Sequence, residues 1–133
     1  MMAIPLFPHI FFIGLGGALG AILRYLCTHI VSTSFDSENS ILWGTFCVNA
    51  LGSFLIGLSA AYFYKQGADM HSLKLLLNIG ILGGFTTFST FSYENVILIQ
   101  NGQFLTAGLY IGLSVICCII LCLISFSLGK SIF

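Results

Sequence analysis

Four long apolar stretches constrain the fold of this chain more than any other feature. They cover approximately residues 7–31, 41–64, 75–100 and 104–128 and are separated by short polar segments. A membrane-spanning helix needs about 20 consecutive, mostly apolar residues. Strands of a membrane barrel would instead alternate polar and apolar residues over about ten positions. The pattern predicts an all-α integral membrane protein, a single domain over residues 1–133 with four transmembrane helices.

The composition agrees with a chain whose solvent is the lipid bilayer. Hydrophobic residues make up 58% of the 133 residues and charged residues only 6%, whereas a soluble domain has about 25% charged residues. The formal net charge is zero, so no basic field indicates a nucleic-acid partner. Five cysteines lie within the apolar stretches without metal-ligand spacing, which favours small buried side chains over disulfides or metal ligands.

Few charges encode the orientation of the chain. Four spans would place both termini and the segment between the second and third spans on one side, which has Lys65, Lys74 and Lys130. The opposite side has at most Arg24. The positive-inside rule favours a cytoplasmic N-terminus, but by only about two charges, so we expect that the chain can insert in either orientation.

Small residues are spaced for close helix packing. Gly16 and Gly20 form a GxxxG pair in the first span, and Gly17 and Ala21 repeat the spacing. Small faces let helix backbones approach each other in lipid. The second span has such a face, composed of Thr45, Asn49, Gly52, Ser53 and Gly57. Four helices packed this closely leave little room for a path within one subunit, so a homo-oligomer is expected.

The third span contains a tract that departs from a regular apolar helix. Residues 83–94 read GGFTTFSTFSYE. Each of the paired glycines costs about 1 kcal/mol in a helix interior, and the hydroxyl side chains compete for backbone hydrogen bonds. We predict a helix break at residues 83–87, near mid-membrane, with an unbroken helix whose hydroxyls bond back to carbonyls as the alternative. Freed carbonyls at this depth would suit a hard cation such as Na⁺.

One stripe of the helix after this break combines phenyl rings with polar groups. Phe88, Phe91, Glu94 and Asn95 share a helical face, and the second span adds Asn49 near mid-membrane. The edge of a phenyl ring is electropositive, and hydroxyl and amide groups donate hydrogen bonds. This combination predicts a conduit for a small, strongly hydrated anion, without a fixed positive charge that would trap it.

Arg24 and Glu94 are the two charges well inside the predicted spans. Intramembrane charges are functional candidates, but Arg24 is close enough to a span end to reach the interface, and Glu94 is close enough to be solvated. Both readings stay open for both residues. The sequence has neither a metal-binding cluster nor a nucleophile–base pair, so we expect no enzymatic activity.

At these residues the sequence resembles the CrcB/Fluc family of fluoride channels over nearly the whole chain. The most specific matching segment is GGFTTFSTF, residues 83–91. The other matching positions are residues 17–21 with Arg24 and Tyr25, then Gly44, Thr45, Asn49, Gly52, Phe54 and Gly57, and finally Tyr110 and Ser114.

The resemblance implies an antiparallel, dual-topology homodimer with two fluoride pores. It also implies a structural Na⁺ at the centre of the dimer interface, bound by backbone carbonyls of Gly83 and Thr86. Phe88 and Phe91 would turn their ring edges toward fluoride, and Asn49 would donate an amide hydrogen bond.

Further roles are implied for polar residues along the pore. Ser89, Thr90, Tyr110 and Ser114 are candidates for its polar lining. Glu94 would lie at a pore vestibule, and Arg24 is expected to be structural. The sequence departs from the expected pattern in the fourth span, where Cys117, Cys118 and Cys122 stand at positions expected to be small or hydroxyl-bearing.

The expected function is passive, fluoride-selective export across the cytoplasmic membrane. The partners would be fluoride, Na⁺, a second copy of the chain and the lipid bilayer, with no nucleic acid. A proton-coupled small multidrug exporter is the alternative, but it needs a mid-membrane carboxylate, and Glu94 lies toward a span end. A purely structural subunit would leave Asn49 and the hydroxyl cluster without a role.

Overall fold

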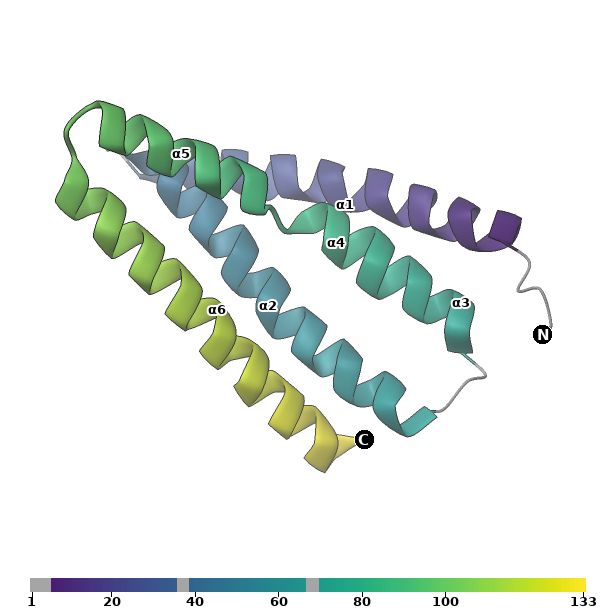
Figure 1. Cartoon of the computed structure of the whole chain (residues 1–133). Helices are drawn as coiled ribbons and strands as arrows, with labels where there is room; N and C mark the ends of the chain where they lie inside the picture. The colour runs from purple at the N-terminus through teal and green to yellow at the C-terminus, as the bar shows by residue number, and fades with distance from the viewer. Residues whose placement is uncertain (1–5, 36–38, 67–69) are drawn as a thin grey trace.

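The computed structural model describes residues 6–35, 39–66 and 70–133, which form long helices (Figure 1). The first two spans are α1 (Leu6–Ser34) and α2 (Ser40–Gln66). The third is divided into α3 (His71–Lys74), η2 (Leu75–Leu82), α4 (Gly83–Phe85) and α5 (Phe88–Gln100), and the fourth is α6 (Phe104–Ile132). Four helical segments are long and apolar enough to cross a membrane. The prediction of an all-helical, four-span protein is therefore confirmed.

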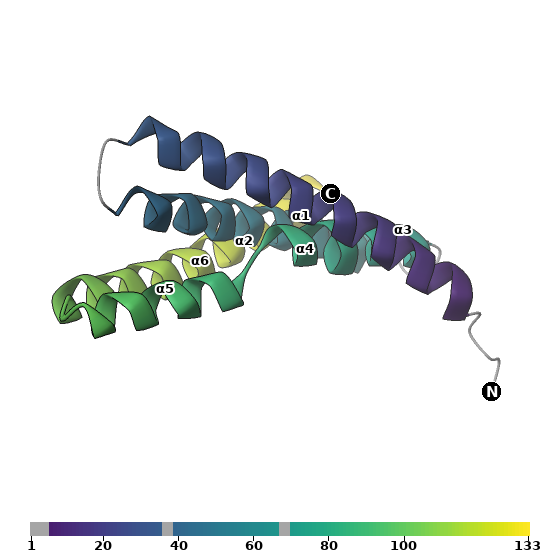
Figure 2. The same cartoon turned by 90° about the horizontal axis from the view of Figure 1, so that it is seen from above.

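α2 is the central helix of the arrangement. It packs most extensively on α6, and it also contacts α1 and the long segments of the third span. Seen from above, α2 lies between α1 and α6 (Figure 2). α1 packs on η2 and α4, whereas α5 packs on α6. The two halves of the third span therefore have different neighbours.

Small residues form the contact between α1 and the first half of the third span. A Cβ added to Gly16 would lie 2.5 Å from the carbonyl oxygen of Leu76, and one added to Gly84 would lie 2.6 Å from the carbonyl oxygen of Gly17. Any side chain at these positions would collide with backbone. The predicted GxxxG face thus packs within the chain, because it lets two helix backbones approach directly.

The contact between α2 and α6 also depends on small residues. Ala61 and Ser125 are completely buried, and a Cβ on Gly129 would meet the Ala61 methyl at 2.6 Å. Toward the other end, larger side chains take over, where Phe91 and Leu98 of α5 form a buried cluster with Ala107 and Tyr110 of α6.

The third span is interrupted at Thr86 and Thr87, within the range predicted from the sequence. Both residues have extended backbone, with φ −78° and ψ 157° at Thr86 and φ −148° and ψ 119° at Thr87. The paired glycines, however, stay helical in α4. Their place in the sequence is explained by the close approach of α1 to Gly84 rather than by local unwinding.

The first half of this span differs from the regular α-helix expected there. Residues Leu75–Leu82 form a π-helix, a form that is rare and is found mostly at functional sites. Nothing in the apolar sequence LLLNIGIL distinguishes it from an α-helical segment. The expectation of an ordinary helix in this half was therefore wrong.

Both ends of the molecule agree with the predicted topology. The start of α1, the end of α6 and the short α3 lie at one end of the bundle (Figure 1). At the opposite end α5 and α6 are joined by the predicted tight turn, in which Gly102 has a φ of +74°. This left-handed conformation favours glycine.

Candidate functional site

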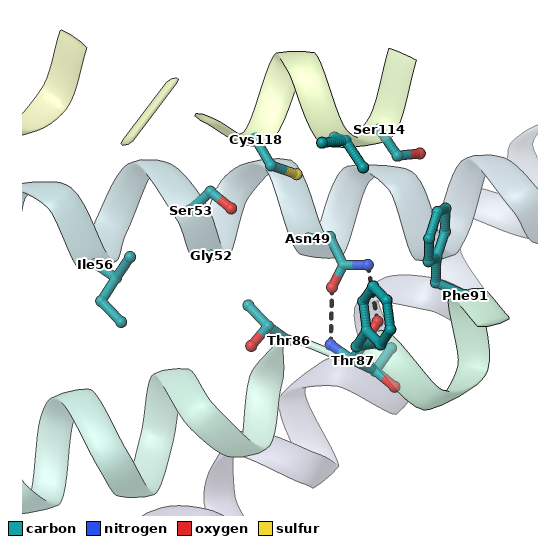
Figure 3. A pocket seen from close by; sticks show the side chains of 11 residues that line it. Asn49, Gly52, Ser53, Ile56, Thr86, Thr87, Phe91, Ser114 and Cys118 are labelled. Atoms are coloured by element: carbon teal, nitrogen blue, oxygen red, sulfur yellow. Dashed lines mark hydrogen bonds between the residues drawn. The ribbon is translucent and has the colours of Figure 1, made fainter. Parts of the chain in front are cut away.

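Asn49 of α2 ties down the interruption in the third span. Its amide Nδ2 donates to the Thr87 carbonyl at 2.9 Å, and the Thr87 backbone N–H donates to Asn49 Oδ1 at 2.8 Å (Figure 3). One side chain therefore satisfies both backbone groups of an unwound residue at a depth where neither would find water. Asn49 still has a second amide N–H, because its NH₂ group carries two donors.

The same contact changes the hydrogen bonding of Gly83. In a continuous α-helix the Thr87 N–H would donate to the Gly83 carbonyl four residues earlier. Here that N–H donates to Asn49 instead. The carbonyl of Gly83 is thereby released from its helical partner next to the extended backbone of Thr86.

A cluster of hydroxyl groups caps the first turn of α5. Thr87 Oγ1 accepts a hydrogen bond from the Thr90 backbone N–H at 3.2 Å. The same oxygen lies 3.0 Å from Thr90 Oγ1 and 3.2 Å from Ser89 Oγ. The positive end of the α5 dipole thus lies at the interruption, surrounded by hydroxyl groups, which is a favourable environment for an anion.

A cavity of about 270 Å³ opens beside this interruption. Asn49 lies at its centre, between α2, the Thr86–Thr87 segment and α6 (Figure 3). None of the described residues that line it is charged. The lining consists of Asn49, Gly52, Ser53, Ile56, Thr86, Thr87, Phe88, Phe91, Ser114, Val115 and Cys118.

Two phenyl rings border the cavity in different ways. Phe91 is buried, with 7% of its surface exposed, and packs on Tyr110 at a ring-centroid distance of 5.1 Å. Phe88 is 76% exposed, and its ring lies 5.6 Å from that of Phe91 at an interplanar angle of 46°. The structure therefore brings both predicted residues to one cavity, but only Phe91 is held by packing within this chain.

Ser114 of α6 adds a buried hydroxyl to the same cavity. It is 5% exposed, and its Oγ has no hydrogen-bond partner among the described residues. Asn95 Oδ1 is likewise buried without a described partner, although the Asn95 amide donates to the Phe91 carbonyl. Buried polar groups are normally paired, so the Ser114 hydroxyl is available to a polar occupant of the cavity.

Glu94 lies apart from this cavity in a hydrogen-bonded cluster. It is 7% exposed and accepts hydrogen bonds from Thr45 Oγ1 at 2.7 Å and from Tyr110 Oη at 2.8 Å. The alternative of a simply solvated carboxylate is wrong for this chain. Sequence reasoning missed Thr45 as its partner, although the i, i+4 spacing of Thr45 and Asn49 places them on one face of α2.

Arg24 of α1 lies near this cluster. Together with Glu94 and Thr45 it lines a separate cavity of about 250 Å³, which also includes Thr87 and Thr90. The Thr87–Thr90 turn therefore separates the two cavities, because Thr87 lines both.

The described residues contain no group of three or more His, Cys, Asp or Glu side chains that could hold a metal ion. A cation at this site would have to be bound by backbone carbonyl and hydroxyl oxygens. Gly83 and Thr86 stand at the interruption, where such oxygens are available.

Comparison with known proteins identifies the family. The family model described as "CrcB-like protein, Camphor Resistance (CrcB)" matches residues 11–126. A protein of Flavobacterium psychrophilum named fluoride-specific ion channel FluC is 47% identical over 106 residues, covering 80% of this chain and 84% of its own length.

Two other relatives carry the same name. The Campylobacter jejuni protein is 45% identical over 91% of this chain and 93% of its own length. The Novosphingobium aromaticivorans protein is 42% identical over 79% and 82% respectively. With four helices able to cross a bilayer and a family match over nearly its whole length, this multi-pass protein of the cell membrane belongs to the CrcB-like family.

Proposed function

We propose that this protein is a fluoride-selective channel that exports fluoride passively across the cell membrane, and that it is not an enzyme. The observation that carries the proposal is the uncharged cavity beside Thr86 and Thr87, which joins an amide, hydroxyl groups and two phenyl rings. The three relatives named as fluoride-specific ion channels support the choice of ion. Fluoride enters acidic surroundings partly as HF and is trapped inside as the anion, so a passive channel lets it leave.

The chemistry of the lining suits a small anion that must lose water. The Asn49 amide and the Ser114 hydroxyl offer donors, and the edges of Phe88 and Phe91 offer weak positive charge. The α5 N-terminus adds a favourable dipole. Since the described lining contains no Lys, Arg or His, the ion is stabilised without being held by a full opposite charge.

A multidrug exporter receives no support from the site. Such a transporter needs a carboxylate that exchanges a proton for a cationic substrate. Glu94 is instead engaged by Thr45 and Tyr110, and it does not line the cavity that contains Asn49 and the phenyl rings.

The proposal includes a structural Na⁺ bound by the carbonyl oxygens of Gly83 and Thr86. The residues fit this ion in one respect, because Asn49 takes the N–H that would otherwise occupy the Gly83 carbonyl. Hard cations prefer oxygen ligands. The ion would hold the interrupted backbone and would take no part in moving fluoride.

The proposal also includes an antiparallel homodimer of dual topology. Phe88 is 76% exposed although it borders the cavity, and a second copy of the chain would cover it and complete the wall. The near-balance of Lys and Arg between the two sides supports insertion in both orientations. In this assembly Ser89, Thr90, Tyr110 and Ser114 would contribute to the polar lining, Glu94 would lie at a vestibule, and Arg24 would be structural.

Fluoride efflux from liposomes tests the proposal, with Phe88→Ile as the variant. Removing the ring edge is expected to slow fluoride efflux by about tenfold or more, because each tenfold loss corresponds to only about 1.4 kcal/mol on the barrier. Phe104→Ile is the matched control, since Phe104 is 68% exposed on α6 and does not line the cavity. Chloride efflux as fast as fluoride efflux, or an unchanged rate in Phe88→Ile, would contradict the proposal.

A further inference from the structure

One reactive side chain in the cavity is not used by any interaction described above. Cys118 of α6 has a free thiol and lines the same cavity as Asn49, Phe91 and Ser114. We propose that Cys118 is a covalent modification site within the ion path, at which small thiol-reactive electrophiles close the channel. This inference rests on the proposed function, because it takes the cavity to be part of the conduit.

The position of Cys118 on α6 supports this assignment. Cys118 follows Ser114 by four residues, so the two side chains share one face of the helix. Figure 3 shows both on the side of α6 that faces the cavity, with the Cys118 sulfur on the side where Asn49 lies. The thiol is half-buried, which leaves part of its surface open to the cavity.

An independent observation indicates that this part of the cavity takes a polar occupant. The Ser114 Oγ is buried and has no partner among the described residues. A hydroxyl in this state is expected to bind a water molecule or a passing ion. A reagent that follows the same route would therefore arrive next to the Cys118 sulfur.

The chemistry of closure is a thiol–disulfide type exchange with a thiosulfonate. The Cys118 thiol loses its proton to water, and the thiolate attacks the sulfenyl sulfur of methyl methanethiosulfonate. A new S–S bond forms to the methylthio group, the S–S bond of the reagent breaks, and methanesulfinate leaves. The product has lost the S–H donor and has gained an apolar group in a cavity of only about 270 Å³.

The other cysteines of α6 provide internal controls. Cys117 lines a different cavity, together with Trp43 and Leu113. Cys122 is not among the lining residues of the cavity beside Asn49, and its carbonyl accepts a hydrogen bond from Ser125. A reagent bonded at either residue would lie outside the proposed path.

The experiment measures fluoride efflux from liposomes before and after treatment with methyl methanethiosulfonate. The parent protein is expected to lose about tenfold of its efflux rate and to regain it after reduction with dithiothreitol. Cys118→Ser and Cys118→Ala are each compared with their own untreated rate, which should not change on treatment. Cys117→Ser and Cys122→Ser, which retain Cys118, should lose efflux as the parent does.

Mass spectrometry of the treated samples separates binding of the reagent from its effect. Cys118 is expected to carry the methylthio group, and saturating fluoride should slow its labelling relative to gluconate. Loss of efflux in both Cys118 variants, a labelled Cys118 with unchanged efflux, or an unlabelled Cys118 in a conducting protein would each overturn the inference. Absence of fluoride efflux before any treatment would instead reject the proposed function on which it rests.

Discussion

At the scale of single residues, Asn49 and Glu94 are the side chains that organise the polar interior. Asn49 satisfies both backbone groups of Thr87, and Glu94 receives two hydroxyl donors from neighbouring helices. Each of these polar groups is buried or half-buried in an apolar bundle. Their value therefore lies mainly in the cost of leaving a partner unsatisfied.

Asn49→Ala should destabilise the protein. The Thr87 N–H and carbonyl would lose their only described partners, and an unsatisfied buried backbone group costs about 1–3 kcal/mol. Unfolding in detergent with increasing sodium dodecyl sulfate measures the loss. Ser53→Ala is the control, because Ser53 lies one turn away on α2 and borders the same cavity. Equal stability of the two variants would contradict the role given to Asn49.

Tyr110→Phe should weaken the cluster around Glu94. The carboxylate would lose one of its two hydroxyl donors, and a hydrogen bond to a charged group contributes about 1.5–3 kcal/mol. The same unfolding assay measures this difference. Tyr93→Phe serves as the comparison, since Tyr93 is 66% exposed on α5. A Tyr110 variant as stable as the Tyr93 variant would show that the bond to Glu94 contributes little.

At the scale of elements, the interruption in the third span follows from local sequence and its geometry follows from tertiary contacts. Hydroxyl residues and glycines at 83–90 were sufficient to predict a break. They did not distinguish between an opening at the glycines and one at Thr86 and Thr87. That choice depends on the approach of α1 to Gly84 and on Asn49, which lies 38 residues before Thr87.

Gly20→Ala should disturb this packing. A Cβ on Gly20 would collide with the Ile81 carbonyl and lie 2.8 Å from the Phe85 backbone nitrogen. Overpacking of this kind costs about 1–3 kcal/mol. Gly14→Ala on the same helix meets nothing within 4 Å and should be neutral or slightly stabilising, because alanine favours helix. A Gly20 variant with the stability of the Gly14 variant would contradict the close contact.

The candidate site was predictable in its residue types but less so in its partners. Asn49, Phe88, Phe91 and Ser114 were predicted to act together, and they do border one cavity. Thr45 was recognised only as part of a small face, because a lone threonine in an apolar span resembles any other packing residue. The π-helix at Leu75–Leu82 was also missed, because an apolar run has no pattern that separates five-residue from four-residue hydrogen bonding.

At the scale of the whole molecule, the four helices form a bundle in which α2 touches every other span. One wall of the cavity includes the exposed ring of Phe88, which a partner subunit is proposed to cover. The Na⁺ proposed at Gly83 and Thr86 would then stabilise the assembly rather than a single chain.

Replacing Na⁺ with N-methylglucamine should lower the stability of the dimer. A ligand present at about 100 times its dissociation constant stabilises the state it binds by about 2.7 kcal/mol, and this contribution would be lost. Crosslinking and size-exclusion chromatography at decreasing protein concentration measure the dissociation, with equal ionic strength as the control. A dimer unaffected by the exchange would count against a bound Na⁺.

The different neighbours of the two halves of the third span have a consequence for how this channel can vary. α1 contacts η2 and α4, and α6 contacts α5, so the oxygens near Gly83 and the rings near Phe91 are supported by separate helices. A substitution in α1 can reshape one half without a steric effect on the other. Only α2 is shared, and Asn49 is the point at which a change in either half would have to be accommodated by both.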